Sequence, residues 1–338
     1  MTDYTLHMGD CLEYMATLPD SSVDLIATDP PYFKVKNEWW DRQWETGDGF
    51  LAWMAEVMAE FYRILRPNGS LYVFASPRMA WGVEGVVRER FAVLNHLVWN
   101  KAGGSRANKA SKEMLRAFFG ESERIIFAEH YNADNIAKGE AGYAAKCDEL
   151  RGFVFEPLRA YLDGERQRAG ATTTEVHEAW CDYRGTKGRM VGHWFGRSQW
   201  ALPTADNYEW LRQTFSRLNH GGDYLRREYE DLRRPFNATP DAPYTDVWTF
   251  PTVNGYAGKH PTEKPLNLME HIVKLSSRPG SVVFDPFMGS GTTGVAALRH
   301  GRKFIGCDAT PKWYERAQER IDGELTSVQQ ATLLEVGA

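Results

Sequence analysis

The chain has 338 residues, of which 43% are hydrophobic and 25% are charged, and these proportions are ordinary for a soluble globular protein. A chain of this length can bury a sizeable core, which excludes a disordered tail protein, a collagen-like chain and a disulfide-dependent miniprotein, and it allows about two domains. The formal net charge of −5 argues against a protein devoted to coating nucleic acid, whereas 12 tryptophans indicate an aromatic core or a surface that stacks on flat groups.

Strands and helices alternate in the first 131 residues. Residues 23–28 form a short apolar run that stops at two prolines, which is typical of a buried strand. Residues 50–65 carry apolar side chains at helical spacing and end at a Pro-Asn-Gly stop signal. We also expect strands over 70–75, 92–99 and 123–130 and a helix over 85–91. The alternation predicts a mostly parallel sheet with helices on both faces.

The middle of the chain has fewer strand signals and more charge. We expect short helices over 172–180, 187–195, 204–218 and 224–232, separated by glycine-containing turns. Two short helices joined by a tight turn are typical of a helix-turn-helix unit. His177, Cys181 and His193 could be imagined as zinc ligands, but a second ligand pair is missing, so we expect no metal.

The α/β pattern returns after this region. Helices are expected over 265–275, 294–300 and 311–321, and strands over 281–284 and 302–307. We therefore expect one α/β domain in two segments, residues 1–131 and 244–325, interrupted by a helical insert over 132–243 and followed by a tail over 326–338. The first residues lack the pattern of a signal peptide, and no window approaches the roughly 20 apolar residues of a membrane span. A soluble cytoplasmic protein without a membrane partner is the expectation.

A glycine-rich turn lies between the strand VVFD and the helix TTGVAALRH. Glycines let the backbone approach a ligand closely, and a helix N-terminus offers unpaired N–H donors. Asp308 ends the next strand, at the place where an acid would bind ribose hydroxyls. The turn lacks the third glycine of the dinucleotide fingerprint, so a purely structural turn is the alternative at this point.

The tetrapeptide Asp29-Pro30-Pro31-Tyr32 follows the first strand. Alone it fits a proline-stiffened strand end. Together with residues 285–293, which read DPFMGSGTT, it resembles the DNA amino-methyltransferases that use S-adenosylmethionine. The DPPY motif comes first and the FxGSGTT motif last, as in the β class of that family, where the target-recognition region lies between them. Details such as DPPYFKVK resemble the orphan adenine methyltransferases of phages and prophages.

The resemblance implies a Rossmann-like class I methyltransferase fold with circularly permuted motif order, and S-adenosylmethionine as the cofactor. It places the methionine ammonium on Asp285, the ribose on Asp308, where many relatives have Glu, and the adenine beside Asp10 and Cys11. The other implied cofactor residues are Phe287, Gly289, Ser290 and Gly291 in the turn, Thr292 and Thr293 as donors to the carboxylate, and His260 and Lys264 beside the methionine moiety. A solvated lysine at a helix start is the alternative for Lys264.

The chemistry expected of the DPPY motif follows from its residue types. An exocyclic amino group is a poor nucleophile because its lone pair is delocalised into the ring. The Asp29 carboxylate and the Pro30 carbonyl can accept its two N–H bonds, and Pro30 and Pro31 keep the backbone rigid. Tyr32 is expected to stack on a base flipped out of the duplex. Adenine N6 in double-stranded DNA is the predicted target, and cytosine N4 is the first alternative.

Two stretches without acids, residues 90–112 and 183–205, carry the local positive charge that phosphate contacts require, although a solvated face would look the same. The second stretch includes the place of a recognition helix, or equally a packing module around Trp194 and Trp200. The loop over 34–44 could fill the gap left by a flipped base or act as a hydrophobic lid. The predicted DNA contacts are Lys34, Lys36, Trp39, Trp40, Lys101, Arg106, Lys109, Lys112, Arg184, Lys187, Arg189, Arg197, Ser198 and Gln199.

Two alternatives come from other functional classes. A DNA-binding regulator with an inactive cofactor domain is disfavoured by the intact Asp29, Tyr32 and Asp285. A dinucleotide-dependent oxidoreductase is disfavoured because it gives the DPPY motif no role. The resemblance is also compatible with a homodimer, and with a phage or prophage gene in a bacterial cell.

Overall fold

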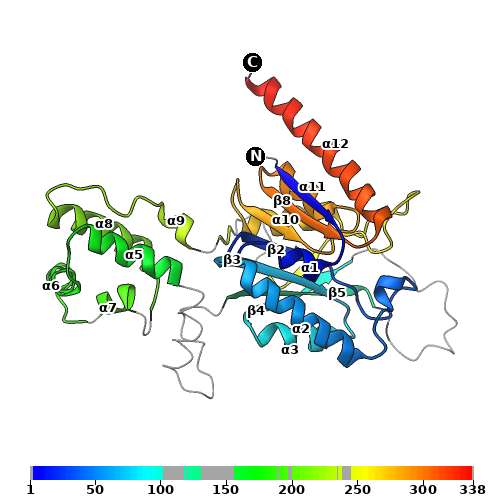
Figure 1. Cartoon of the computed structure of the whole chain (residues 1–338), viewed down its shortest axis with the longest axis horizontal. Helices are drawn as coiled ribbons and strands as arrows, with labels where there is room; N and C mark the ends of the chain where they lie inside the picture. The colour runs from blue at the N-terminus through cyan, green and yellow to red at the C-terminus, as the bar shows by residue number, and fades with distance from the viewer. Residues whose placement is uncertain are drawn as a thin grey trace. The chain divides into compact units, whose positions relative to one another are not determined.

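The computed structural model describes residues 3–101, 118, 120–130, 156–188, 190–196, 200–233, 235–237 and 245–336. The chain divides into two compact units. Unit 1 comprises Met1–Glu129 and Pro235–Ala338 and contains the sheet except for one strand residue, His130. Unit 2 comprises His130–Arg234, and its described elements from Glu156 onward are helices (Figure 1). The insert that we expect over 132–243 overlaps unit 2, but unit 2 ends earlier in the chain.

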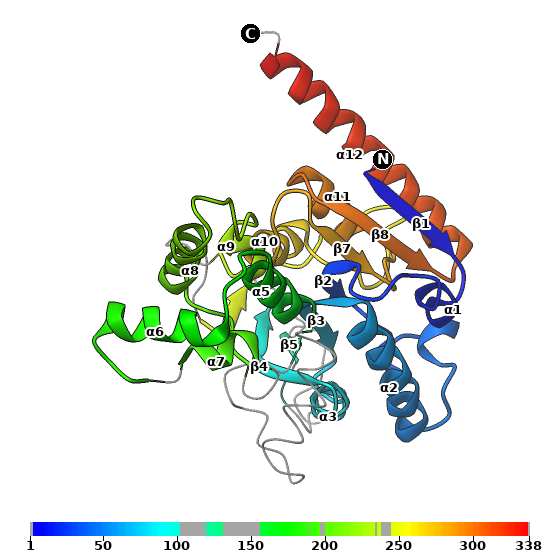
Figure 2. The ribbon, with the colours of Figure 1, turned by 60° about the vertical axis from the view of Figure 1, so that its left-hand side comes forward.

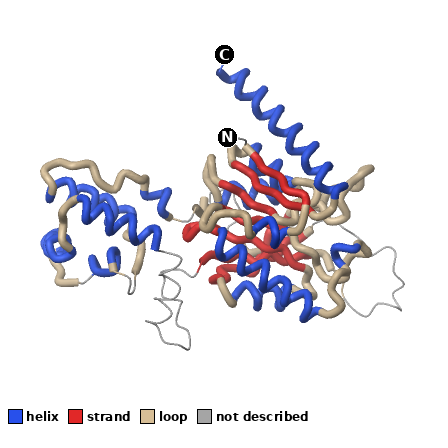
Figure 3. Tube along the Cα trace, viewed as in Figure 1, coloured by secondary structure: helices blue, strands red, loops and turns tan. Residues whose placement is uncertain are grey.

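Unit 1 is built on an eight-stranded sheet with the strand order β1-β8-β7-β2-β3-β5-β4-β6. The strands of this sheet are red in Figure 3. The strands are β1 (Tyr4–Met8), β2 (Val23–Thr28), β3 (Leu65–Ala75), β4 (Phe91–Asn100), β5 (Ser122–His130), β6 (Val247–Thr249), β7 (Val282–Asp285) and β8 (Lys303–Asp308). From β1 to β3 every neighbouring pair is parallel, and β5 runs antiparallel to β3. The predicted mostly parallel α/β fold is confirmed.

Helices cover both faces of this sheet (Figures 1 and 2). One face packs against α1 (Cys11–Met15), α2 (Gly47–Ile64) and α3 (Ala80–Arg88), and the other against α10 (Leu266–Ser276), α11 (Thr292–Arg299) and α12 (Pro311–Val336). The side chains of β2 alternate accordingly, because successive residues of a strand point to opposite faces. Leu25 and Ala27 lie in the core beneath α10–α12, and Ile26 lies in the core beneath α2.

The chain leaves the two central strands in opposite directions. From β2 it passes through α2 to β3, and from β7 it passes through α11 to β8, although β2 and β7 are direct neighbours. In open α/β sheets, ligands bind at such a switch point, outside the carboxyl ends of the strands. Asp29 follows the end of β2 and Asp285 ends β7, so both sequence motifs are brought to this place.

Unit 2 consists of α5 (Glu156–Arg168), α6 (Thr173–Arg184), α7 (Met190–Phe195), α8 (Ala205–Leu218) and α9 (Tyr229–Leu232). Its core is aromatic: the Trp180 ring lies 5.0 Å from the rings of both Trp194 and Trp210, measured between centroids. Trp194 and Trp200 are each only 1% exposed, so the packing interpretation holds for both side chains. Gly185 ends α6 in the left-handed conformation (φ 65°), which makes the tight turn before α7.

Several elements differ from the sequence expectations. The sequence did not indicate β1, α1, α5 and β6, and α3 begins earlier than the helix expected over 85–91. The last helix, expected over 311–321, is longer, because α12 continues to Val336 through most of the tail expected over 326–338. The helix expected over 224–232 shrinks to α9. Leu225 instead takes a left-handed backbone (φ 50°), and its carbonyl accepts hydrogen bonds from Tyr208 and Arg212, so tertiary contacts override helix propensity there.

Candidate active site at the carboxyl edge of the sheet

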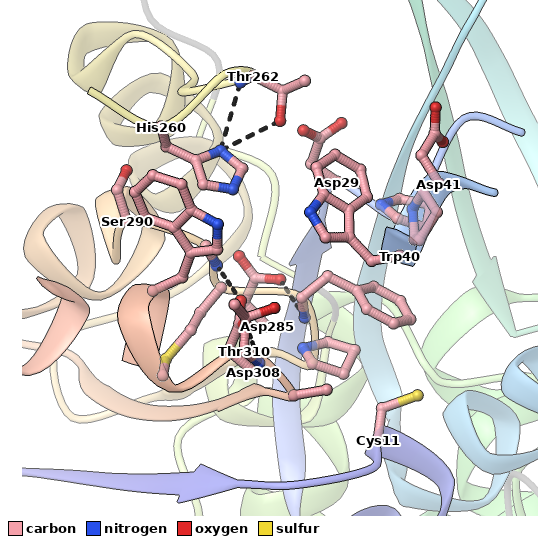
Figure 4. A pocket seen from close by; sticks show the side chains of 18 of the residues that line it. Cys11, Asp29, Trp40, Asp41, His260, Thr262, Asp285, Ser290, Asp308 and Thr310 are labelled. Carbon is pink, nitrogen blue, oxygen red and sulfur yellow. Dashed lines mark hydrogen bonds between the residues drawn. The ribbon is translucent and has the colours of Figure 1, made fainter. Parts of the chain in front are cut away.

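A cavity of about 330 Å³ opens beside the carboxyl ends of β1, β2, β7 and β8 (Figure 4). It contains most of the residues that the sequence analysis assigns to catalysis and to the cofactor. Those that line it are Asp10, Cys11, Asp29, Pro30, Pro31, Tyr32, His260, Lys264, Asp285, Phe287, Gly289, Ser290, Thr292, Thr293 and Asp308. Lys36, Trp39 and Trp40, predicted as DNA contacts, line it as well. One cavity therefore joins two motifs that lie some 250 residues apart in the chain.

Gly291 is the predicted cofactor residue that does not line this cavity. It has φ 78°, and a Cβ atom there would lie 3.0 Å from the Cα atom of Ala317 in α12. Glycine is therefore required for close packing of α11 against α12 rather than for contact with a ligand. Gly289, with φ 50°, does line the cavity, and its N–H donates to Asp308 Oδ2 at 3.0 Å.

Asp285 is buried at the end of β7. Its Oδ1 accepts from the Thr28 hydroxyl at 2.7 Å and the Phe287 N–H at 3.1 Å, and its Oδ2 accepts from the Thr293 hydroxyl at 2.6 Å. Thr293, expected to donate to a cofactor carboxylate, thus donates to Asp285 in this structure. Burial raises the pKa of Asp285 to about 6 although these hydrogen bonds oppose the shift. No described basic side chain pairs with Asp285, so a cationic group in the cavity would stabilise its charge.

Asp308 and Asp10 line the cavity and also hold its backbone. Asp308 accepts from the N–H of Thr310 at 2.8 Å as well as from Gly289, and burial raises its pKa to about 6. Asp10 caps α1 by accepting from the N–H groups of Leu12 at 2.8 Å and Glu13 at 3.1 Å. Both carboxylates therefore fix the backbone that lines the cavity, and both also face the cavity.

Asp29 is 17% exposed through its side chain, and its two carboxylate oxygens have different surroundings. Oδ2 accepts a hydrogen bond from the Lys264 ammonium. Oδ1 is buried and has no hydrogen-bond partner among the described residues. Lys264 is therefore buried, so the alternative of a solvated lysine is wrong. Its ammonium binds the first residue of the DPPY motif, in addition to lining the cavity with the predicted cofactor residues.

Tyr32 is 8% exposed, and its hydroxyl donates to Glu123 Oε2 at 2.8 Å. Glu123 lies on β5, and the sequence analysis attached no role to it. The contact spans 91 positions of the chain, so no local pattern could have indicated it.

Asp41 is a second residue that the sequence analysis missed. It is fully buried, and its carboxylate accepts from the N–H groups of Tyr32 at 2.6 Å, Val35 at 2.7 Å and Lys36 at 2.5 Å. The loop that it holds contains Phe33 and Lys34 with φ 59°, a conformation that residues other than glycine rarely adopt. Asp41 therefore stabilises a strained loop directly after the DPPY motif.

The tryptophans of this loop have different environments. Trp39 is 57% exposed at the cavity, whereas Trp44 packs into the core with its ring 4.6 Å from that of Trp53. Trp40 stacks on His260 with 6.0 Å between ring centroids. Burial lowers the pKa of His260 to about 3, and the positive charges of Lys264 and Lys36 act in the same direction. His260 is therefore neutral, and its Nδ1 accepts from the Thr262 N–H at 3.3 Å.

The other predicted DNA contacts are only partly described. The Lys34 ammonium donates to the Glu45 carbonyl at 2.6 Å, and Lys101 is paired with Glu123. The Arg184 guanidinium lies 5.0 Å from the centroid of the Trp180 ring. Lys187 is exposed. Outside the described residues lie Arg106, Lys109, Lys112, Arg189, Arg197, Ser198 and Gln199.

The described ranges contain no group of three or more His, Cys, Asp and Glu side chains that could hold a metal ion. Of the imagined zinc ligands, Cys181 Sγ lies 3.6 Å from His177 Nε2. None of the described helices is both long and apolar enough to cross a bilayer.

Comparison with known proteins assigns this chain to a protein family. The family model described as "DNA methylase" matches residues 23–319, which include both motifs and the segment between them. The chain belongs to the DNA methylase family. The match begins at the first residue of β2 and ends within α12, so it covers both halves of unit 1.

Curated relatives agree with this assignment. The chain is 27% identical to "DNA adenine methyltransferase YhdJ" of Escherichia coli (strain K12) over 320 residues, 94% of this chain and 82% of that protein. It is 40% identical to "Type II methyltransferase M2.DpnII" of Streptococcus pneumoniae over 119 residues, 34% of this chain and 41% of that protein.

Two solved structures share the fold of this DNA methylase. PvuII DNA methyltransferase (cytosine-N4-specific) matches with a TM-score of 0.53 and 14% identity, covering 95% of this chain and 86% of that one. The M1.HpyAVI–SAM complex matches with a TM-score of 0.50 and 19% identity, covering 94% of this chain and 98% of that one.

Proposed function

We propose that this DNA methylase transfers a methyl group from S-adenosylmethionine to N6 of adenine in double-stranded DNA. The observation that carries the proposal is the single cavity lined by both the DPPY motif and the glycine-rich turn with its buried Asp285. The name of the Escherichia coli relative, which aligns with 94% of this chain, supports adenine as the base. The motif order supports the β class, and the DPPYFKVK segment supports an orphan phage or prophage enzyme.

The residues of the cavity fit S-adenosylmethionine. Asp285 lacks a described cationic partner and would bind the methionine ammonium, while Asp308 and Asp10 would face the ribose and the adenine side. When bound, the cofactor supplies a methyl group that its own positively charged sulfonium activates. The Arg320 guanidinium of α12 donates to the hydroxyls of Ser290 at 2.9 Å and Thr292 at 3.4 Å. These hydrogen bonds stabilise the glycine-rich turn that would lie beneath the cofactor.

The DPPY motif would prepare the target amino group. The unpartnered Oδ1 of Asp29 is a buried acceptor that an incoming N–H would satisfy, and the Pro30 carbonyl would accept the second N–H. Two acceptors draw the nitrogen towards tetrahedral geometry and free its lone pair for attack on the methyl group. Tyr32 would stack on the base, which has to be flipped out of the duplex to reach the cavity. The exposed Trp39 at the cavity would contact the part of the duplex from which the base has been flipped.

Cytosine N4 is the alternative target. The cytosine-N4-specific PvuII enzyme shares the fold, so the fold alone does not distinguish the two bases. The chemistry at Asp29 would be the same, since both targets are exocyclic amino groups.

The test is to incubate unmethylated double-stranded DNA with the protein and S-adenosylmethionine and then to map modified bases by single-molecule sequencing. We expect N6-methyladenine, and its distribution gives the recognition site or shows that none is required. Modification confined to N4 of cytosine would replace the proposed target, and unmodified DNA would overturn the proposed function. A parallel incubation with single-stranded DNA tests the preference for a duplex.

We also propose that unit 2 is the target-recognition region and that its basic stretch contacts phosphates. Replacing Arg184, Lys187, Arg189 and Arg197 together by glutamine should weaken DNA binding and flatten its salt dependence by about 0.9 in the log–log slope for each phosphate that is no longer neutralised. Fluorescence anisotropy at several salt concentrations measures this slope. The charge-conserving control exchanges lysine and arginine at the same four positions and should keep it, whereas an unchanged slope in the glutamine variant would remove this stretch from the interface.

The remaining parts of the proposal concern assembly and location. We infer that the protein acts in the bacterial cytoplasm, and the family resemblance supports a homodimer. Size-exclusion chromatography with light scattering, with and without DNA, measures the oligomeric state.

A further inference from the structure

A group of charged side chains contacts Asp29 of the DPPY motif, and the mechanism described so far uses only Asp29 from this group. The Lys264 side chain is 7% exposed and the Glu123 side chain is 14% exposed. Lys264 Nζ binds Asp29 Oδ2 and lies 3.4 Å from Glu123 Oε2, and the other oxygen of Glu123 binds Lys101. The group combines three segments that are distant in sequence, because Asp29 follows β2, Glu123 lies on β5 and Lys264 precedes α10.

Aromatic rings enclose the ammonium of Lys264. Its Nζ lies 5.2 Å from the centroid of the Tyr32 ring, 5.1 Å from that of Phe74 and 5.9 Å from that of Trp99. Ring faces attract a cation, but they accept no conventional hydrogen bond. Besides a long hydrogen bond to the Thr262 carbonyl at 3.4 Å, the ammonium has the carboxylates of Asp29 and Glu123 as its charged partners. A buried charge that loses such a partner is strongly destabilised.

We propose that Lys264 and Glu123 are positioning residues that hold Asp29 and Tyr32 as one charge-balanced unit. This inference rests on the proposed function. Lys264 holds Asp29 through Oδ2 and so leaves Oδ1 as the acceptor for the target amino group. Glu123 holds the Tyr32 hydroxyl and Lys264 through the same oxygen, so the stacking ring and the accepting carboxylate keep a defined relation to each other.

The electrostatics of the group agree with this geometry. Burial raises the pKa of Asp29, Glu123 adds to this shift, and Lys264 and the Tyr32 hydroxyl oppose it. Although burial disfavours its charge, Lys264 has a raised pKa because both carboxylates face it, so it remains an ammonium. Lys264 and Lys101 lower the pKa of Glu123 to about 2 against the effect of burial. Asp285 is a further acid close enough to interact with Asp29.

Lys264 and Glu123 therefore shift the pKa of Asp29 in opposite directions. If the two residues served only to stabilise the fold, their replacement would not shift the pH dependence of the rate in opposite directions, and this difference provides the test. The measurement is the single-turnover rate of methyl transfer to DNA as a function of pH for the wild-type protein, Lys264→Gln, Glu123→Gln and the double variant. Since Asp29 accepts as a carboxylate, the rate falls as pH decreases through its pKa. This acid limb should move to higher pH by about 1 to 3 units in Lys264→Gln and to lower pH in Glu123→Gln.

The double variant provides the sharpest comparison, because it removes both charges and its acid limb should lie between those of the single variants. Above the limb we expect Lys264→Gln to lower the rate about 100-fold, because the carboxylate is no longer held in place. Lys274→Gln and Glu56→Gln are the matched controls, since they remove the same charges at exposed positions and should leave the profile unchanged. Thermal unfolding and titration with S-adenosylmethionine show whether each variant is folded and binds the cofactor.

The outcomes separate the inference from the function on which it rests. A wild-type protein that transfers no methyl group to adenine would overturn the proposed function. An active wild-type protein whose acid limb stays in place in both single variants would overturn only the inference, as would a double variant whose limb lies outside those of the single variants. If Lys264→Gln fails to fold, the shift to lower pH in Glu123→Gln still decides the question.

Discussion

Replacing Asp29 by alanine is expected to lower the rate of methyl transfer about 10³-fold or more. The substitution removes the carboxylate that accepts the target N–H, and it also deprives Lys264 of one of its two carboxylate partners. Cofactor binding should be largely unchanged, because Asp285 keeps its own three donors. Single-turnover transfer of labelled methyl groups measures the rate, and calorimetric titration measures cofactor affinity.

Two further variants sharpen this prediction. Asp29→Asn keeps an acceptor oxygen but loses the charge, so its rate should lie between those of the alanine variant and the wild-type protein. Asp48→Ala removes an exposed carboxylate at the start of α2 and should retain normal turnover. If Asp29→Ala turned over normally, the proposed role of the DPPY motif could not be correct.

Asp41→Ala is expected to have an effect as large as that of Lys264→Gln, although the sequence motifs did not indicate Asp41. The substitution leaves three backbone N–H groups without their acceptor. The Tyr32 N–H is buried, and leaving such a group unsatisfied costs about 1–3 kcal/mol, whereas the part-buried N–H groups of Val35 and Lys36 lose less. The left-handed conformations of Phe33 and Lys34 persist only while the surroundings enforce them. We expect the loop to relax, Tyr32 to lose its position and the transfer rate to fall about 100-fold.

The measurement pairs single-turnover kinetics with urea unfolding, because both the rate and the free energy of unfolding should decrease. Asp41→Asn retains one acceptor oxygen and should be intermediate in both. Glu45→Ala is the control within the same loop, since Lys34 binds the Glu45 backbone carbonyl and not its side chain. A wild-type rate in Asp41→Ala would show that the loop is held by other contacts.

The parts of the site that the sequence predicted are those encoded locally. The run over 23–28 followed by two prolines, and the glycines after VVFD, each specify a strand end within a few residues. Parallel pairing then brings both ends to one edge, because the carboxyl ends of parallel neighbours meet there. The residue types at these ends were sufficient to indicate the kind of chemistry.

The parts that the sequence did not predict depend on contacts across the fold. Glu123 meets Tyr32 only because β5 joins the sheet beside β3, and Lys264 meets Asp29 across a sequence separation of 235 positions. Asp41 lies near Tyr32 in sequence, yet an acid among tryptophans carries no pattern that distinguishes a buried acceptor from a solvated one. The residue type alone does not show whether a charged side chain is paired in the core or exposed to water.

The route of the chain through unit 1 has a consequence for how such an enzyme diversifies. The polypeptide leaves after β5 and returns at Pro235, and no described residue between these points lines the cavity. We therefore expect a change of length or composition within this segment to leave the described hydrogen bonds of Asp29 and Asp285 in place. Under the proposal that unit 2 is the target-recognition region, an exchanged insert should redirect the enzyme to another DNA site without requiring a new catalytic centre.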